Sequence, residues 1–125
     1  MREFEDLSGK IIGAAIEVHK ILGPGFLESI YREAMKLELG MRGIPYKDEE
    51  EIEIYYKDEK VGLHRLDILV ADQIVVELKA AKAINENHMA QTLSYLKATG
   101  LEVGLVLNFK PAKLEIKRIV LGAKT

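Results

Sequence analysis

The sequence has 125 residues, no cysteine, and a formal net charge of −2 from 18 basic and 20 acidic residues. The lack of cysteine excludes disulfide bonds and zinc–thiolate sites. The small negative charge argues against strong non-specific binding of nucleic acid, which usually requires a basic surplus. The length predicts a single domain over residues 1–125. The charged first ten residues and the lack of a long apolar run predict a cytoplasmic protein without a membrane segment.

Two helices are predicted at the start of the chain. Apolar residues recur at helical spacing over residues 7–22, and Asp6 or Ser8 is the expected N-cap. The strong break at residues 23–25, Gly-Pro-Gly, ends this helix. His19 lies at the edge of the apolar stripe, where it is either packed and hydrogen-bonded or part of a site.

The second helix is predicted over residues 26–41. Glu28 falls in its first turn, where a carboxylate either complements the positive end of the helix dipole or points toward a site formed by later strands. Tyr31 lies one turn further along on the same side. The expected buried stripe of this helix consists of Leu27, Ile30, Ala34 and Leu37.

Three antiparallel strands are predicted next. Residues 52–56 alternate as in a half-buried strand, residues 57–60 turn the chain, and a second strand starts at Val61. This strand leads into residues 65–79, RLDILVADQIVVELK, where two runs rich in Ile, Val and Leu flank a polar turn at residues 71–73. These residues form the predicted hairpin on which the functional interpretation depends.

The hydrophobic pattern selects the register of this hairpin. If residues 71–73 form the loop, Val70 pairs with Ile74, and a slip by one residue would turn half of the apolar side chains outward. The opposite face of the hairpin then carries Asp67 directly across from Glu77, with Lys79 two residues further along. The apolar face consists of Leu66, Ile68, Val70, Ile74, Val76 and Leu78.

Two carboxylates on neighbouring strands repel each other, so this pair should have a compensating partner. A divalent cation such as Mg²⁺ or Mn²⁺ would compensate fully because it prefers hard oxygen ligands. Asp67 and Glu77, followed by Lys79, therefore predict a metal site with a cationic side chain beside it. The alternative is a half-buried strand whose charged residues simply face solvent.

A third helix is predicted from Asn85 or Asn87 to Thr99. Gln91 and Tyr95 are four residues apart and share a face that is different from the core stripe. Gly100 ends the helix. The expected core stripe consists of Met89, Leu93 and Leu96.

The remaining segments complete the predicted fold. Residues 103–107 are continuously apolar, as expected for a strand that is covered on both faces, and residues 114–121 form a final strand. The helix before residue 103 allows this strand to run parallel to an earlier one. One helix, three antiparallel strands, a crossover helix and two strands predict an α/β sandwich around a central mixed sheet.

Several short motifs resemble the GxxExxY protein family. Residues 25–31, GFLESIY, fit the pattern that names the family, and the likeness runs from about Leu7 to Val120. The family is similar to the PD-(D/E)XK nuclease superfamily, whose core order of helix, three strands, helix and strand agrees with the predicted elements. The resemblance implies a restriction-endonuclease-like fold. The other fitting segments are residues 19–25, 65–67, 76–80, 91–95 and 104–109.

The resemblance also implies roles for the candidate residues. Asp67 and Glu77, together with the carbonyl of Leu78, would bind Mg²⁺ or Mn²⁺ as cofactor. Lys79 would be the motif lysine, and Glu28 would be the acidic residue of the first core helix. These four charged side chains form the expected catalytic group.

Substrate contacts are expected from other residues. Gln91 and Tyr95 resemble the Gln-x-x-x-Tyr element of the RecB-like branch, and Tyr31 and His19 complete the predicted substrate-binding set. Leu66 stands where the name of the superfamily has proline. Three lysines are candidates either for backbone contacts or for ordinary solvated surface: Lys82, Lys110 and Lys113.

The predicted function is hydrolysis of phosphodiester bonds in nucleic acid, with DNA as the expected partner, by a protein whose small size is compatible with a homodimer. The alternative is a non-catalytic module that keeps the nuclease-like fold and binds nucleic acid or a protein. Hydrolysis of sugars by the two carboxylates is disfavoured, because neighbouring strands place them close together and little chain remains to build a sugar cleft. The sequence does not distinguish single from double strands, or cutting internally from cutting at an end.

Overall fold

The computed structural model describes residues 2–122, with side chains from Asp6 onwards. Five of its strands form one mixed sheet in the order β1-β4-β5-β6-β7, in which β5 and β6 are parallel and the other neighbours are antiparallel. The predicted α/β sandwich with a central mixed sheet is therefore confirmed. The elements are α1 (Arg2–Leu22), α2 (Glu28–Met41), β1 (Tyr46–Asp48), β2 (Glu51–Tyr56), β3 (Glu59–Arg65), β4 (Ile68–Val70), β5 (Ile74–Lys79), α3 (Glu86–Thr99), β6 (Val103–Asn108) and β7 (Glu115–Val120).

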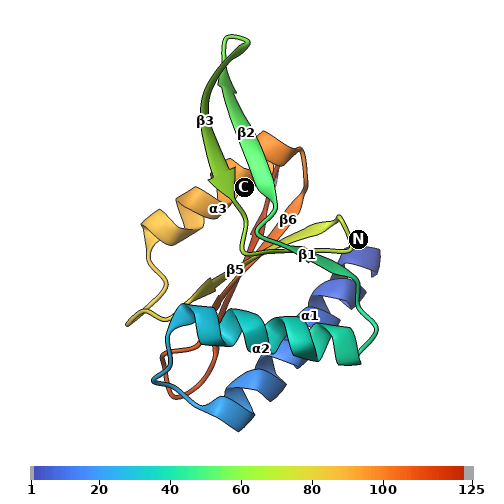
Figure 1. The fold of residues 1–125 in the computed structure, drawn as a ribbon, viewed down its shortest axis with the longest axis vertical. Coiled ribbons are helices and arrows are strands. Elements are labelled where there is room, and N and C mark those ends of the chain that lie inside the picture. The colour runs from blue at the N-terminus through green and yellow to red at the C-terminus, as the bar shows by residue number, and fades with distance from the viewer. Residues whose placement is uncertain (1, 123–125) are drawn as a thin grey trace.

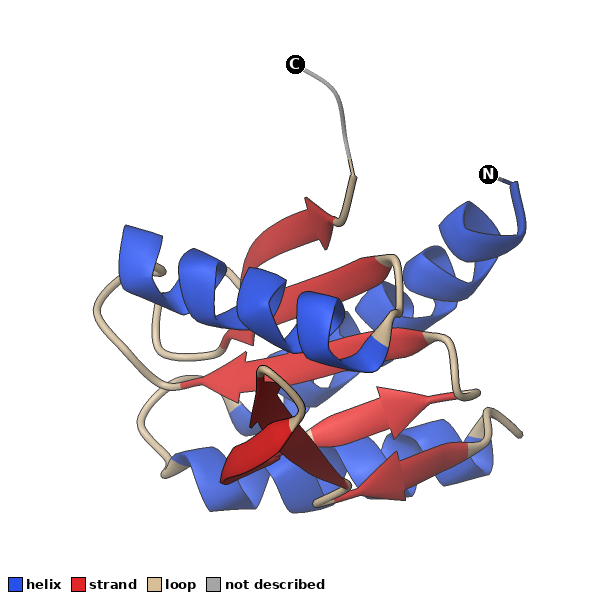
Figure 2. Ribbon diagram, turned by 90° about the horizontal axis from the view of Figure 1, so that it is seen from above, coloured by secondary structure: helices blue, strands red, loops and turns tan. Residues whose placement is uncertain are grey.

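Helices cover both faces of the sheet (Figure 2). The first core lies between the sheet and helices α1 and α2, and its sheet residues include Ile74, Val76, Leu78, Leu105 and Leu107. The second core lies on the opposite face under α3, and it includes Val75, Leu96 and Val106. Every residue of β6 is buried, in agreement with its continuously apolar sequence.

Helix α3 lies close to strand β6 at one glycine. A Cβ atom built on Gly104 would be 2.7 Å from Cγ2 of the buried Thr92, so glycine at this position allows the helix to approach the sheet. The side chain of Asn85 caps the helix by accepting the amide N–H of His88 at 2.9 Å. Gly100 ends it in the left-handed conformation. The predicted boundaries of this helix are confirmed.

Strands β2 and β3 form a separate two-stranded hairpin, the β2–β3 arm, which projects from the rest of the molecule (Figure 1). The predicted meander of three paired strands is therefore wrong. Strand β3 ends at Arg65, and β4 starts a new strand at Ile68 whose outer neighbour is β1, an element that the sequence did not predict. The base of the arm packs on the α3 side of the sheet through Ile52.

The hairpin register is confirmed where β4 pairs with β5, because Val70 faces Ile74 across the turn. The prediction is wrong for Leu66, which packs in the second core, on the opposite face from Ile68. The amide N–H of Leu66 donates to the carbonyl of Glu50 at 2.8 Å. The chain is therefore still bonded to the segment before β2 at this point and joins the sheet only afterwards.

Helix α2 buries a face that differs from the predicted one, namely Tyr31, Met35 and Leu39. The predicted stripe lies on the outer side, where Ala34 is half-buried and three large side chains are exposed: Leu27, Ile30 and Leu37. The helix has two apolar stripes, and its own periodicity does not show which of them meets the sheet.

Two smaller predictions about helices are also wrong. Asp6 and Ser8 are not N-caps, because α1 begins at Arg2 and both residues lie inside it. Met89 is exposed rather than buried in α3, whereas Leu96 is fully buried as predicted.

Candidate active site at the carboxyl end of strand β5

The predicted carboxylate pair, Asp67 and Glu77, lies at the end of strand β5, which extends beyond the shorter neighbouring strand β4. Residues 77–79 of β5 pair only with β6. Asp67 precedes β4 and bonds to β5 through its side chain, because its Oδ2 accepts the amide N–H of Leu78 at 2.8 Å. Its own amide N–H donates to Oε2 of Glu77 at 3.2 Å. These hydrogen bonds hold the two carboxyl groups next to each other.

Glu77 is a buried carboxyl group, with 5% of the residue exposed. Its pKa is raised to about 8, first by burial and then by the negative charges of Asp67 and Glu28. The amide of Asp67 and the ammonium of Lys79 act in the opposite direction but do not outweigh these effects. A cation bound between the carboxyl groups would reverse this balance, because it would stabilise the ionised form of Glu77.

Glu28 of helix α2 and Lys79 of strand β5 both lie near the carboxyl groups at the end of β5. Glu28, in the first turn of α2, accepts the amide N–H of Ala80 at 3.4 Å, and its charge acts on Glu77. Lys79 is the last residue of β5 and is half-buried. The salt bridges of the described side chains include none between Lys79 and Glu77, a pair that would have favoured the non-catalytic binding module.

Arg32 is a further charged residue beside Asp67, and the sequence analysis did not identify it. Its Nη1 lies 3.9 Å from Oδ1 of Asp67, and the side chains of Arg32 and Asp67 are 26% and 25% exposed. A local signal was available, because Arg32 follows Glu28 by four residues, and residues with this spacing share one face of a helix. The same face of α2 thus places a carboxylate, Glu28, and a guanidinium, Arg32, beside the end of β5.

Asn108 fixes the loop that follows Lys79. Its side-chain amide donates to the carbonyl of Ala81 at 2.8 Å and to Oε1 of Glu115 at 3.0 Å, and its Oδ1 accepts the amide N–H of Ala81 at 3.0 Å. Asn108 is fully buried and lies across from Lys79 in the parallel ladder. Lys79 is therefore held on the β6 side, where its carbonyl accepts the amide N–H of Phe109 at 2.9 Å, and the segment that follows it is anchored by Asn108.

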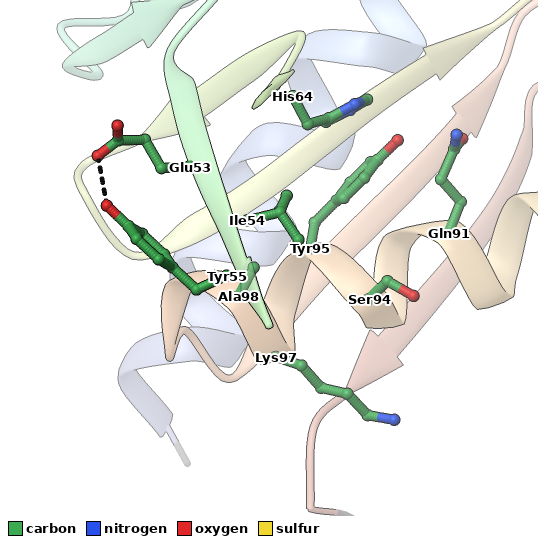
Figure 3. Close-up of a pocket in the computed structure, with 9 residues that line it drawn as sticks. All are labelled: Glu53, Ile54, Tyr55, His64, Gln91, Ser94, Tyr95, Lys97 and Ala98. Atoms are coloured by element: carbon green, nitrogen blue, oxygen red, sulfur yellow. Dashed lines mark hydrogen bonds between the residues drawn. The ribbon is translucent and has the colours of Figure 1, made fainter. Parts of the chain in front are cut away.

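Tyr95 is the predicted substrate residue that lies nearest to the carboxyl groups. It is buried, and its pKa is raised by burial first and then by the charges of Glu77 and Asp67. Gln91 is exposed one turn earlier on α3. Figure 3 shows the polar ends of Tyr95 and Gln91 pointing toward the same side of a pocket between α3 and the β2–β3 arm.

His64 is a second residue that the sequence analysis missed. Its ring stacks on the ring of Tyr95 with a centroid separation of 3.9 Å. Burial lowers the pKa of His64, and the charge of Lys79 lowers it too, against the opposing charge of Asp67. His64 belongs to β3 and Tyr95 to α3, so the contact joins two elements far apart in the sequence, and no local pattern could have indicated it.

Tyr31 and His19 belong to the packing of the two N-terminal helices against the segment that follows β6. Tyr31 is fully buried, its hydroxyl donates to the carbonyl of Gly23 at 2.6 Å, and its ring stacks on Phe109 at 4.6 Å. Nε2 of His19 is 2.9 Å from the carbonyl oxygen of Pro111. The structure therefore gives both residues contacts that explain them without a ligand, and for His19 this is the packed, hydrogen-bonded alternative.

The three lysines considered for backbone contacts are all exposed, namely Lys82, Lys110 and Lys113. Lys113 borders a separate pocket together with His19. Their exposure is equally compatible with solvated surface side chains.

The oxygen atoms at the end of β5 fit a hard divalent cation. Mg²⁺ and Mn²⁺ are bound by carboxylates and carbonyl groups, with water molecules completing the shell. Asp67 and Glu77 supply two carboxylates, and the Leu78 carbonyl lies between Glu77 and Lys79 along the chain. The described part of the chain contains no group of three or more His, Cys, Asp or Glu side chains arranged to hold a metal, so a cation would rely on two carboxylates, the backbone and water.

Comparison with protein families gives one match. The sequence profile described as the PD-(D/E)XK nuclease superfamily matches residues 5–119, which is nearly the whole sequence. The chain belongs to this superfamily, whose members are generally nucleases. Comparison with curated proteins gave no significant match.

A solved structure supports the same fold. The crystal structure of a protein called SSO0001 is similar with a TM-score of 0.57 and 20% sequence identity. The similarity covers 77% of this chain and 50% of that protein, so the chain spans about half of SSO0001.

Within residues 2–122, no helix combines the length and the apolar character that crossing a membrane requires.

Proposed function

We propose that the protein is a metal-dependent nuclease that hydrolyses phosphodiester bonds in DNA or RNA. The observation that carries this proposal is the buried carboxyl of Glu77, held beside Asp67 by a backbone hydrogen bond at the end of a strand that finishes in Lys79. With both carboxyl groups ionised, such an arrangement is unfavourable unless a cation is bound, and membership of a nuclease superfamily supports a metal site here.

Asp67, Glu77 and the Leu78 carbonyl would hold Mg²⁺ or Mn²⁺. The bound ion would supply Lewis-acid polarisation of the phosphate and of water. Lys79 would orient the attacking water and stabilise the negative charge that develops on the phosphoryl oxygens. Glu28 would hold a water molecule from the opposite side, since its carboxylate already reaches the amide of Ala80.

Arg32 and Tyr95 would complete the site without taking part in proton transfer. Arg32 would place a positive charge near Oδ1 of Asp67 and so help to hold its carboxylate in position. Tyr95 would present its hydroxyl, and Gln91 its amide, to a phosphate or a base.

Cleavage assays with end-labelled single-stranded and double-stranded DNA and RNA test this proposal. Each substrate is incubated with Mg²⁺, Mn²⁺ or EDTA, and the wild type is compared with Lys79→Ala. Metal-dependent cleavage that is lost in the variant is the expected result. Unchanged cleavage in Lys79→Ala would overturn the mechanism, and the absence of both cleavage and metal binding would favour the non-catalytic binding module.

Two finer assignments remain proposals. Membership of the GxxExxY family and of the RecB-like branch rests on the motifs at residues 25–31 and 91–95.

The second proposal is a homodimer. Exposed apolar side chains on the outer side of α1 and α2 offer a surface for it, namely Ile21, Leu37 and Met41. Sedimentation of the purified protein over a range of concentrations would test the dimer.

A further inference from the structure

The β2–β3 arm and helix α3 border a pocket of about 650 Å³, the arm pocket (Figure 3). Volumes in this range are typical of sites for small organic ligands. Its walls come from two elements: Ile54, Tyr55 and His64 belong to the arm, and Ser94, Tyr95 and Ala98 belong to α3. The proposed nuclease mechanism uses only one edge of this space, through Tyr95 and Gln91.

The arm pocket lies beside the candidate active site. Tyr95 borders the pocket and is close enough to Asp67 and Glu77 for their charges to act on it. His64 stacks on Tyr95, and its Nε2 is buried without a hydrogen-bond partner among the described residues. The stacked rings of His64 and Tyr95 therefore form an aromatic wall of the pocket on the side of the carboxyl groups.

The charges around the pocket do not favour the phosphates of a duplex. Among the residues that border it, Lys97 is the one ammonium, and the one carboxylate, Glu53, is paired with Lys60. Arg65 of the arm is paired with Glu51, so Lys97 is a single positive charge at the border of the pocket. Because backbone binding depends on unpaired positive charge, nucleic acid that enters here should be held through its bases.

We propose that the arm pocket receives one unpaired base next to the scissile phosphate, so that the substrate is single-stranded nucleic acid. The inference rests on the proposed nuclease function and names the substrate class of the same site. Tyr55 is 57% exposed, and its ring offers a face for stacking at the rim. Gln91 and Ser94 offer donors and acceptors to the edge of the base. A base of a duplex would first have to be unpaired and unstacked to enter such a pocket, and this cost favours single strands.

Binding in EDTA tests the inference without any cleavage. Fluorescence anisotropy is measured with labelled DNA and RNA oligonucleotides of about 12 nucleotides, a length within the range of single-strand sites, each as a single strand and as a duplex of the same sequence. Ala98→Trp fills the pocket from an exposed position of α3. Ala90→Trp is the matched control, because Ala90 is also an exposed alanine of α3 but does not border the pocket.

The expected result is that single strands bind at least about tenfold more tightly than duplexes. Ala98→Trp should lose about tenfold in single-strand affinity, the size expected when one stacked base is lost. Ala90→Trp should bind as the wild type does. Tyr55→Ala, an exposed change that leaves the helix intact, should weaken single-strand binding in the same way, and circular dichroism confirms the folding of each variant.

Equal affinity for single strands and duplexes would overturn the inference, as would wild-type affinity in both Ala98→Trp and Tyr55→Ala, or the absence of any binding. The two proposals fail separately. If the protein cleaves nucleic acid with metal but Ala98→Trp and Tyr55→Ala bind as the wild type does, only the pocket inference fails. If these variants bind more weakly but the wild type cleaves no substrate, only the nuclease function fails. Comparison of the DNA and RNA strands shows which sugar the site prefers.

Discussion

The amide N–H of Asp67 donates to the carboxyl group of Glu77, while the carboxyl group of Asp67 accepts the amide N–H of Leu78. The two acids are therefore placed by the backbone of the segment before β4 and of β5. Amide side chains at either position would keep an acceptor oxygen for the same bonds. Asp67→Asn and Glu77→Gln are consequently suitable variants for separating charge from structure.

Divalent cations should stabilise the wild type and not Asp67→Asn. A cation that binds the folded protein alone raises the free energy of unfolding by about 3 kcal/mol at a concentration one hundred times its dissociation constant. Thermal unfolding is measured with Mg²⁺, with Mn²⁺ and with EDTA. Equal shifts of Tm in the two proteins would remove the metal from this site.

The metal-free protein should lose stability as the pH rises from about 4.5 to about 8. The pKa of Glu77 is raised from 4.5 in its ordinary state to about 8 in the folded state. The stabilising effect of the bound proton is fully present below the unfolded pKa and is lost as the pH rises through the folded pKa. The loss should be on the order of a few kcal/mol.

Denaturant unfolding in EDTA at several pH values measures this loss. Glu77→Gln should remove most of the slope between pH 5 and about 8, because it has no proton to lose. Saturating Mg²⁺ should flatten the wild-type slope by favouring the ionised carboxylate. A slope that is the same in the wild type and in Glu77→Gln would contradict the assignment.

Arg32→Ala should destabilise the metal-free protein, and Mg²⁺ should reduce the difference. Arg32 is the cation beside Asp67 in the absence of metal, and a partly exposed pair of this kind contributes up to about 1 kcal/mol. Arg42→Ala is the control, because Arg42 pairs with Glu38 at 2.7 Å on the surface of α2. Its effect should not depend on Mg²⁺, and an identical response of both variants would argue against Arg32 as part of the site.

Gly104→Ala should destabilise the fold by about 1 to 3 kcal/mol, the usual cost of overpacking a core. The added Cβ would meet Cγ2 of Thr92 at 2.7 Å. Thr92→Ser removes that methyl group, so the double variant should recover part of the loss. Gly62→Ala is a matched control within a strand, since no described heavy atom outside its immediate neighbours lies within 4 Å of its added Cβ.

Tyr31→Phe should lower stability by about 1 kcal/mol while leaving substrate affinity unchanged. The variant loses the hydrogen bond that the Tyr31 hydroxyl donates to the carbonyl of Gly23 and the one that it accepts from the amide N–H of Phe26, but it keeps the ring that stacks on Phe109. Denaturant unfolding and oligonucleotide binding are compared with those of the wild type. A selective loss of binding without a change in stability would instead support Tyr31 as a substrate-binding residue.

The parts of the fold that could be predicted are those in which the local sequence pattern is compatible with only one structure. Residues 66–78 allow only one register with a wholly apolar face, and the pairing of Val70 with Ile74 is found as predicted. The continuous apolar run of β6 required cover on both faces. The end of α3 follows from Gly100, which adopts the left-handed conformation that glycine readily takes.

The parts that could not be predicted depend on contacts between distant segments. Helix α2 has two apolar stripes, and only the packing against the sheet selects the one that contains Met35 rather than Leu37. Leu66 changes face because the chain is bonded to Glu50 before it joins β5. The pairing of His64 with Tyr95 needs the arm to fold back on α3. Such contacts have no periodicity in the sequence.

The β2–β3 arm forms a sheet of its own, and the five-stranded sheet makes its hydrogen bonds without it. The five-stranded sheet holds the carboxyl groups of Asp67 and Glu77 through the pairing of its own strands, whereas the tip of the arm, residues 56–60, takes no part in that pairing. Loops of other lengths grafted at this tip should therefore change the reach of the arm and leave the register of β5 intact.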